Sequence, residues 1–428
     1  MDKVIKPYSS GIIVISAILL FLSACGKAAS ASPSVGVLSV ADGKSAAAGI
    51  ALEQENGYDA GFKVVDTQFD IEPVDEGAPQ SDIQRTIRDM VQGKVKDKDV
   101  PPLLALLGAT SNEATSHAAA LVNFFNVPML IPSANGDNLF PSNNLWAFRL
   151  SAPGAAYANY LFGKVVTKQA MDAISIKPSD SVFGDPPQLK VAILYERNTF
   201  GESAAVATAT AVMAQSVSIR VYDNFKPDNT DPESLKTLAK KVKDAGAQLV
   251  YLISSDPALA KNLTQTLRAV FDSRSMPIMV GQAEGFAARD FVDSKESEGV
   301  YVLRQKIDHK SCPPGVKSIY DAQSYAAVYL LDYALQQANE NLSGIVKQFS
   351  LGGKSGSAIQ QQREALRDAL KQINVNAPCL GKVAFDNTGQ NKLLNLELIR
   401  IIKGVEVDAT TENFLNVLKA RLAADLYQ

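Results

Sequence analysis

The chain has 428 residues, 46% of them hydrophobic and 20% charged, with 42 basic and 45 acidic side chains and a formal charge of −3. This length and apolar content give room for two domains of ordinary size. The acidic excess argues against nucleic acid as a partner, which requires a concentrated basic surface. With two histidines in the chain, neither a histidine-rich metal site nor a Ser-His-acid triad is expected.

The N-terminus has the pattern of a secretory signal peptide. Two lysines precede an apolar run over 11–22, which is too short to span a bilayer as a mature helix. The segment Leu22-Ser23-Ala24-Cys25 then resembles the lipobox of bacterial lipoproteins. The resemblance implies that residues 1–24 are removed and that lipid on Cys25 holds the protein on a membrane of the bacterial envelope, facing the periplasm or the exterior. The alternative is an uncleaved anchor helix with an incidental cysteine.

Residues 25–34 are small and rich in Ser and Ala, so they predict a tether. Apolar runs then alternate with amphipathic ones. The predicted strands cover 35–38, 62–66, 103–107, 128–131, 190–195, 218–222, 249–253, 277–280 and 299–303. The predicted helices cover 45–55, 82–92, 113–125, 155–168, 202–215, 232–244 and 257–270. Strands rich in Val, Ile and Leu suit parallel sheets buried on both faces, so this rhythm predicts an α/β fold.

The strands fall into two series, which predict two lobes with a boundary near residue 150. Later in the chain, the sequence predicts a long helix over 320–339 and a last amphipathic helix over 412–427. Stretches rich in Pro, Gly, Ser and Asp over 167–188 and 350–357 predict surface loops.

Cysteine use is sparse. If Cys25 is lipidated, Cys312 and Cys379 remain. Two cysteines in an oxidising compartment can pair, and the alternative is two separate thiols.

Motifs of enzyme chemistry are absent from the sequence. Gly43-Lys44-Ser45 and Gly353-Lys354-Ser355 end like a phosphate-binding loop, but Leu38 and Gln348 replace the glycine that this motif needs five positions earlier. The chain has no Gly-x-Ser-x-Gly elbow and no Cys or His cluster with metal spacing. We therefore expect a protein that is not an enzyme and has no cofactor or metal.

Polar turns follow five of the predicted strands. They cover 108–112, 132–135, 196–201, 254–257 and 281–286. In open α/β sheets, ligands bind beyond the carboxyl ends of the strands. A glycine followed by hydroxyl side chains at a helix start can also bind an anion through backbone N–H groups. These turns predict a ligand site.

At these turns the chain resembles the type I periplasmic solute-binding proteins of the Leu/Ile/Val-binding family, which serve ABC importers. The matching stretches are 108–120, 127–135, 190–201, 231–257, 279–285, 320–338 and 381–389. The resemblance implies two doubly wound parallel-sheet lobes, joined by three crossover strands at a hinge, that close over a small ligand. It places 35–150 with about 306–385 in lobe 1, 151–305 with about 390–404 in lobe 2, and a helical extension over 405–428.

The resemblance also assigns ligand-binding residues in lobe 1. Ser111 and Asn112 stand where family members bind the ligand carboxylate, and Ser133, Ala134 and Asn135 match a stretch that binds carboxylate and amine. The alternative for Ser111 or Asn112 is to cap the helix that follows.

In lobe 2, Phe200 matches an aromatic residue, Ser255 and Asp256 match a position that is often aromatic or acidic, and Glu284 matches an acid that can pair with an ammonium group. Asp256 has a helix cap as its alternative, Phe200 a place in the core, and Glu284 a place in a solvated loop.

The sequence also departs from the family pattern. The loop over 39–45 is short, Asn135 replaces a threonine, Phe200 lacks a hydroxyl, and 71–78 is acidic. The overall prediction is an extracytoplasmic solute-binding lipoprotein of an ABC importer that binds an amino acid or a similar carboxylate and docks on a membrane permease. The alternative is a non-transport envelope lipoprotein of the same fold that acts as a regulator or sensor by protein contact.

Overall fold

The computed structural model describes residues 34–39, 63–64, 67–68, 70–75, 79–95, 98–99, 103–108, 111–174, 188–215, 217–226, 232–316, 318–349 and 356–426. Cys25, the tether and the predicted helix over 45–55 lie outside the described residues. Within these ranges, none of the helices combines the length and the apolar character that a bilayer crossing requires.

The sheet of lobe 1 is parallel throughout. Its strand order is β4-β1-β7-β8-β9. The bounds are β1 Ser34–Ser39, β4 Asp70–Asp75, β7 Leu103–Leu107, β8 Met129–Ile131 and β9 Ala147–Arg149. Short hairpins join β2 (Lys63–Val64) to β3 (Thr67–Gln68) and β5 (Lys94–Val95) to β6 (Lys98–Asp99).

The prediction that 62–66 forms a strand of this sheet is wrong. Its residues enter the β2–β3 hairpin, and the neighbour of β1 is β4, in the acidic segment that looked unusual in the sequence. Strand β4 lies at the sheet edge and contains Pro73. Because proline cannot donate to a strand ladder, it is tolerated at an edge.

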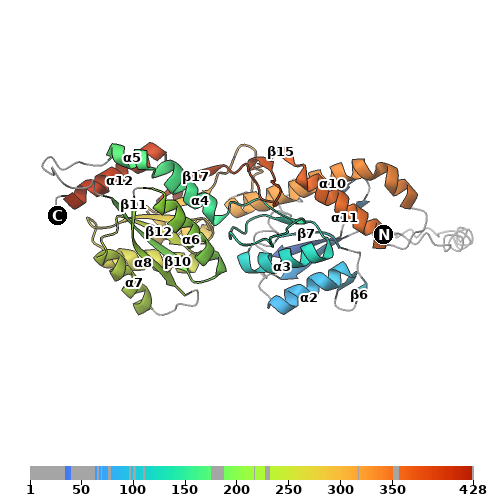
Figure 1. Ribbon diagram of the computed structural model, residues 1–428, viewed down its shortest axis with the longest axis horizontal. Helices are drawn as coiled ribbons and strands as arrows, with labels where there is room; N and C mark the ends of the chain where they lie inside the picture. Colours follow the sequence, from blue (N-terminus) through green and yellow to red (C-terminus); the bar gives the residue numbers. More distant parts are fainter. Residues whose placement is uncertain are drawn as a thin grey trace, which may run out of the picture. The chain divides into compact units, whose positions relative to one another are not determined.

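Helices cover both faces of the lobe 1 sheet (Figure 1). On one face, α2 (Gln80–Val91) and α3 (Asn112–Phe125) pack through buried Ile83, Ile87, Ala118 and Val122. On the other lie α10 (Ile319–Phe349) and α11 (Gly356–Lys371). Burial on both faces explains why all five residues of β7 are apolar and buried.

The sheet of lobe 2 has the order β11-β10-β12-β13-β14-β17-β18. The bounds are β10 Leu189–Glu196, β11 Val217–Phe225, β12 Leu249–Ile253, β13 Ile278–Gln282, β14 Tyr301–Gln305, β17 Leu396–Ile402 and β18 Val405–Asp408. The strands from β10 to β14 pair in parallel, whereas β17 and β18 are antiparallel additions.

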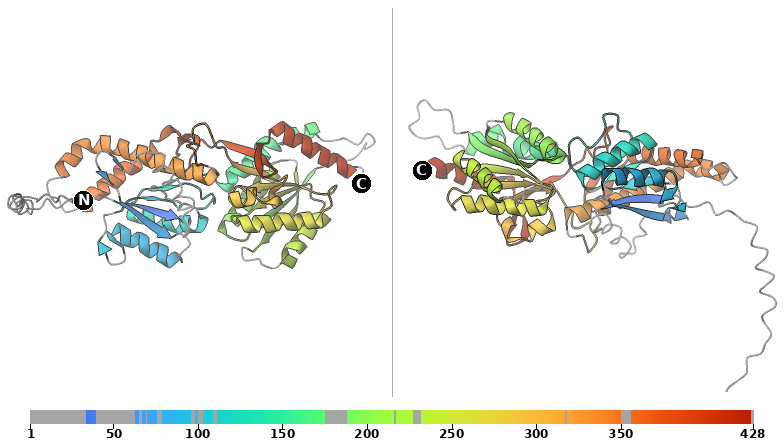
Figure 2. Two further views of the ribbon diagram at one scale, coloured as in Figure 1. Left: turned by 180° about the vertical axis from the view of Figure 1, so that it is seen from behind. Right: turned by 90° about the horizontal axis from the view of Figure 1, so that it is seen from below.

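The helices of lobe 2 are α4 (Gly154–Tyr160), the π-helix η1 (Leu161–Val165), α5 (Lys168–Ile174), α6 (Thr199–Met213), α7 (Pro232–Asp244), α8 (Pro257–Val270), α9 (Arg289–Val292), the 3₁₀ turn η2 (Lys295–Ser297) and α12 (Thr411–Leu426). The C-terminal helix α12 lies against this lobe in both views of Figure 2. Its Phe414 is fully buried and packs edge-on against Tyr301 of β14, with ring centroids 5.0 Å apart.

The described chain passes between the two sheets after β9, after β14 and before β17. The first and third passages are hydrogen-bonded side by side: Asn391 N donates to Arg149 O over 3.0 Å, and Gln390 Nε2 donates to Ser151 O over 3.0 Å. The prediction of an α/β fold with two parallel-sheet lobes is thus confirmed.

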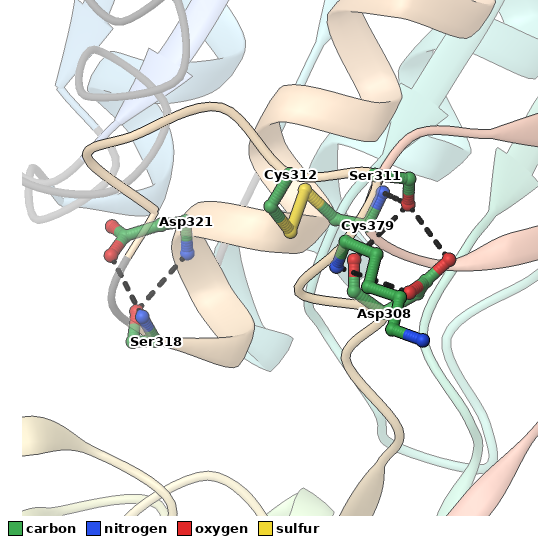
Figure 3. Close-up of a disulfide and its surroundings, with 7 residues drawn as sticks. Asp308, Ser311, Cys312, Ser318, Asp321 and Cys379 are labelled. Carbon is green, nitrogen blue, oxygen red and sulfur yellow. Dashed lines mark hydrogen bonds between the residues drawn. A yellow bond between two sulfur atoms is a disulfide. The ribbon is translucent and has the colours of Figure 1, made fainter.

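A disulfide joins Cys312, in the passage before α10, to Cys379 in the hairpin of β15 (Asn374–Ala377) and β16 (Gly381–Ala384) (Figure 3). The same passage is bound to the hairpin by Asp308 N, which donates to Cys379 O over 2.7 Å. Two hydrogen bonds between Ser318 and Asp321 then form a capping box at the start of α10.

Candidate functional site

The polar turns predicted from the sequence follow strands that are neighbours in the two sheets. In lobe 1, β7 pairs with β8, and in lobe 2, β12 lies between β10 and β13. Because all these strands are parallel within each sheet, their carboxyl ends meet at one edge. The turns of each lobe therefore lie together.

In lobe 1, Asn112 connects two of these turns. Ser111 is the N-cap of α3, where its hydroxyl accepts from Ala114 N over 3.2 Å. The Oδ1 atom of Asn112 accepts from Gly136 N over 2.6 Å, which fixes the turn after β8 to the start of α3.

The turn after β8 contributes Ser133, Ala134 and Asn135, which are all buried. Two residues that follow β9, where the chain passes to lobe 2, bind the backbone of this turn. Ser151 Oγ donates to Ala134 O, and Gly154 N donates to Asn135 O over 2.9 Å. Among the described residues, the Oγ atom of Ser133 and the Oδ1 atom of Asn135 are buried without a hydrogen-bond partner. Buried polar atoms are usually paired, so these two have the bonding capacity that a polar ligand would use.

In lobe 2, Glu196 organises the turns after β10 and β12. This carboxylate is 3% exposed. Its Oε2 atom accepts from the N and Oγ atoms of Ser255, over 2.7 and 2.9 Å, and its Oε1 atom accepts from Asn198 Nδ2 over 2.8 Å. Sequence reasoning did not select Glu196, although its position at the last residue of an apolar strand was a usable signal.

Two predicted ligand contacts of lobe 2 have structural roles in this arrangement. Asp256 is the N-cap of α8, where its Oδ1 atom accepts from Ala258 N over 2.6 Å. Phe200 lies in the first turn of α6 and is 2% exposed within the main apolar core.

Glu284 connects the two lobes. Its Oε1 atom accepts from Asn112 Nδ2 over 3.3 Å, and its backbone carbonyl accepts from the hydroxyl of Tyr320 on α10. The side chain is 8% exposed, and the backbone has a φ of 80°, in the left-handed region that non-glycine residues seldom adopt. Such backbone outliers cluster at binding and active sites.

The turn that contains Glu284 is packed against the turn after β12. Gly285 N donates to Ser254 O over 2.9 Å, and a Cβ atom on Gly285 would lie 2.8 Å from Asp256 O. Glycine is therefore required at 285 for the two turns to approach, and Glu284 lies beside Ser255 and Asp256.

Two tyrosines surround Glu284. Burial raises the pKa of Tyr157 on α4 and of Tyr320, and the negative charge of Glu284 raises both further. Both phenols therefore stay protonated at neutral pH and act as hydrogen-bond donors. Periodicity places these tyrosines on helices, but it does not indicate which lobe they face.

Buried Arg149 and half-buried Asp137 carry opposite charges near the lobe 1 turns. Arg149 is 4% exposed, donates to Gly136 O, and donates from Nε to Gln390 Oε1 over 2.6 Å. Burial lowers the pKa of Arg149 to about 10, so it remains a cation. Burial raises the pKa of Asp137, and the backbone N–H of Ala155 and the charge of Arg149 oppose that rise.

Among the residues with described positions, no group of three His, Cys, Asp or Glu side chains could hold a metal ion. The turns offer hydroxyl, amide and carboxylate groups instead. Such groups can recognise a small polar molecule by hydrogen bonds and charge.

Comparison with known proteins agrees with this geometry. The profile of a family described as receptor family ligand binding region matches residues 189–403. Solved structures with the same fold include a leucine binding protein from Thermotoga maritima, with a TM-score of 0.66 at 12% identity, covering 88% of this chain and 98% of that chain.

A branched-chain amino acid transporter substrate binding protein from Streptococcus pneumoniae, in complex with isoleucine, has a TM-score of 0.61 at 16% identity, covering 88% of this chain and 97% of that chain. A solute binding protein of an ABC transporter from R. palustris, in complex with benzoate, has a TM-score of 0.64 at 14% identity, covering 88% of this chain and 95% of that chain. Similarity at this level of identity establishes a shared fold.

Proposed function

Because this chain belongs to the family of receptor ligand binding regions, we propose that it is a solute-binding lipoprotein of an ABC importer. It captures a small carboxylate, an amino acid or a similar compound, between its two lobes and presents it to a membrane permease. No bond is made or broken in this role. The lipid on Cys25 holds the protein at the membrane outside the cytoplasm.

The observation that carries the proposal is the contact between Asn112 and Glu284. A single hydrogen bond joins the turn of one lobe to the turn of the other, at the strand ends where α/β folds bind ligands. On the lobe 1 side, the Ser133 and Asn135 oxygens are buried without a partner among the described residues. On the lobe 2 side, Glu284 supplies a carboxylate.

This division of groups suits a zwitterion. The carboxylate of an amino acid would bind the start of α3, with Ser111 and the Ser133–Asn135 turn. The ammonium group would bind Glu284 through a charge-assisted hydrogen bond. Contacts to both lobes favour the closed arrangement, so ligand binding and lobe closure are coupled.

A ligand screen tests the proposal. The purified chain without its lipid is titrated with leucine, isoleucine, glutamate and benzoate, and binding is measured by calorimetry and by the shift in thermal midpoint. Glu284→Gln should weaken amino acid binding at least tenfold, because it removes the partner of the ammonium group. Binding of benzoate, which has no ammonium group, should change much less.

The other outcomes are also informative. If no compound in a broad panel of amino acids and organic acids binds, the solute-binding proposal is wrong, and a regulator that acts by protein contact is favoured. Conversion of any compound would indicate an enzyme. An equal loss of leucine and benzoate binding in Glu284→Gln would show that Glu284 is not an ammonium partner.

The lipid anchor has its own test. Cells that express the full chain are labelled with an alkyne fatty acid and fractionated. We expect the label and the membrane association in the parent chain and neither in Cys25→Ser. Labelling of the Cys25→Ser chain would contradict the lipobox assignment.

A further inference from the structure

A cavity of about 360 Å³ lies beside the β15–β16 hairpin, at the C-terminal end of α11. Its lining includes the lysines Lys371, Lys382 and Lys392 and the apolar residues Ile373, Phe385 and Leu393. None of these belongs to the strand-end turns of the candidate ligand site. The volume is within the range of small-molecule sites.

The hairpin explains why the lysines surround a hollow. Ala384 of β16 pairs with Asn374 of β15, and Lys382 lies two residues before Ala384, on the same face of the strand. The backbone N–H of Lys392 donates to Ala384 O over 2.9 Å, so the following segment runs along the other edge of β16. The small side chain of Ala384 leaves space between these longer ones.

The cavity concentrates uncompensated positive charge. All three lysines are exposed, no acidic side chain lines the cavity, and none of the three forms an ion pair with a described residue. No arginine lines it either. Ammonium groups act as point charges, and three of them around one hollow favour a phosphate group, which carries nearly two negative charges, over a singly charged carboxylate.

The base of the cavity is apolar. Ile373 and Phe385 are buried, at 2% and 4% exposure, and Leu393 is 38% exposed at the rim. Leu393 is the exposed member of this set, so a bare phosphate ion would leave it wet, while a compound with an apolar part would cover it.

We propose that this cavity is an accessory binding site for an organic phosphate. The phosphate group is held by Lys371, Lys382 and Lys392, and the apolar part of the molecule rests on Ile373, Phe385 and Leu393. The proposal does not depend on the solute bound between the lobes.

Calorimetric titration with phenyl phosphate tests the site. The triple variant Lys371→Gln/Lys382→Gln/Lys392→Gln should bind at least tenfold more weakly than the parent, and binding to the parent should weaken as salt is raised. The matched control is Lys226→Gln/Lys240→Gln/Lys419→Gln, which removes the same charge from exposed positions elsewhere. This control, and Glu284→Gln, should bind phenyl phosphate like the parent.

Four results would overturn the proposal. Equal weakening in both triple variants would show a response to net charge alone. Tighter binding in Glu284→Gln, with no loss in the triple lysine variant, would place phenyl phosphate between the lobes, because the neutral amide removes a charge that repels the phosphate. Equal affinity for inorganic phosphate would remove the role of the apolar base. Lysine-dependent binding to phosphatidylglycerol vesicles, with no binding of phenyl phosphate, would assign the lysines to a membrane surface.

Discussion

At the scale of single residues, Gly201 shows how closely the turn after β10 is packed. A Cβ atom at this position would lie 1.9 Å from Glu196 O, within the turn that Glu196 organises. Gly201 N also donates to Asn198 Oδ1 over 2.7 Å, which caps α6. Only glycine allows the helix to start this close to the strand end.

We therefore expect Gly201→Ala to lower the free energy of unfolding by about 3 kcal/mol, because the added methyl group forces the turn apart. The control is Gly163→Ala in the π-helix η1, where an added Cβ meets no described atom within 4 Å. That change should be neutral or stabilise by up to about 1 kcal/mol. Urea unfolding of both variants measures the difference, and equal stabilities would contradict this packing.

Asp272 provides a pH-dependent test. Backbone N–H groups of Ser275 and Arg274 donate to its Oδ1 atom, each over 2.9 Å, and these bonds lower the pKa of the carboxyl group. A lowered native pKa means that the ionised form stabilises the fold above the unfolded pKa, and that this contribution is lost as the pH falls through the native pKa.

Asp272→Ala should thus lower the thermal midpoint at pH 7, and the gap to the parent should narrow as the medium is acidified. Asp272→Asn keeps an acceptor oxygen without a charge, so its midpoint should lie between the two at pH 7. Midpoints measured from pH 7 down to about pH 2 follow this change. A gap that stays constant with pH would show that the charge has no role.

The site residues were predictable from the sequence to different degrees. Ser111, Asn112 and Glu284 stand at strand ends, a position that a sequence with clear strands reveals. The bond between Asn112 and Glu284 was not predictable, because it joins residues 172 positions apart through two different sheets. The position of Glu196 at a strand end marked it as a candidate, but the sequence does not show that its carboxylate binds Ser255 and Asn198 in the neighbouring turns.

At the scale of elements, the disulfide closes a long covalent loop. It joins positions separated by 67 residues and encloses both α10 and the described part of α11. In the chain-entropy account, a loop of this length stabilises the fold by about 4 kcal/mol, because it restricts the unfolded state.

We expect Cys312→Ala/Cys379→Ala to reduce the free energy of unfolding by up to about 4 kcal/mol. Reductant should lower the stability of the parent toward the same value and leave the double variant unchanged. Chemical denaturation with and without reductant measures both effects. A parent chain that is indifferent to reductant would contradict the role of the bond.

Substitutions of Asp256, at the start of α8, can distinguish a helix-capping role from a ligand-binding role. Asp256→Ala should cost about 1 kcal/mol of stability, because Ala258 N loses its acceptor, while Asp256→Asn should keep nearly all of it. If Asp256 is only a cap, Asp256→Asn binds the ligand found in the screen like the parent. A tenfold loss of affinity in Asp256→Asn, with its stability preserved, would show a direct ligand contact.

Elements with strong periodicity were predicted well, and those shaped by their surroundings were not. Strands β7 and β12 and helices α7 and α8 have the predicted bounds. Strand β4 was missed because its acidic, proline-containing sequence suits only an edge. The helix predicted over 155–168 divides into α4 and η1, because apolar spacing does not distinguish an α-turn from a π-turn. Helix α5 lies within 167–188, where the sequence predicted a surface loop.

At the scale of the whole molecule, one of the two apolar clusters runs through both lobes, and the other lies in lobe 1. A single apolar cluster contains Leu107 and Phe148 of lobe 1 together with Leu194 and Leu252 of lobe 2. Polar contacts of Gln390 support the same region: its Oε1 atom accepts from Arg149 Nε over 2.6 Å, and its Nε2 atom donates to Ser151 O over 3.0 Å.

The two lobes should therefore unfold together, in one calorimetric transition. Gln390→Ala should lower the free energy of unfolding by about 2 kcal/mol, because it leaves a buried guanidinium N–H without its acceptor. The exposed neighbour Asn387 supplies the control, and Asn387→Ala should have little effect. Two separate transitions in the parent chain would contradict a shared core.

The two-lobed architecture was predictable because each sheet is assembled mainly from consecutive strands with their own periodicity. Periodicity did not indicate the later additions, although the family resemblance placed about 390–404 in lobe 2, where β17 lies. Strands β17 and β18 return to lobe 2 after the 90 residues that separate Gln305 from Leu396. Strand β17 mixes buried and half-buried residues and β18 is largely exposed, so nothing local indicates which sheet they join.

The hydrogen bond from the Asn112 amide to Glu284 affects which solutes can bind between the lobes. A solute that binds at Glu284 Oε1 competes with the donor that Asn112 already supplies there. An uncharged N–H offers a bond of the same kind and gains nothing by the exchange, whereas a cationic donor forms a bond roughly twice as strong. The hydrogen bond from Asn112 to Glu284 would therefore disfavour neutral compounds, whatever their size or shape.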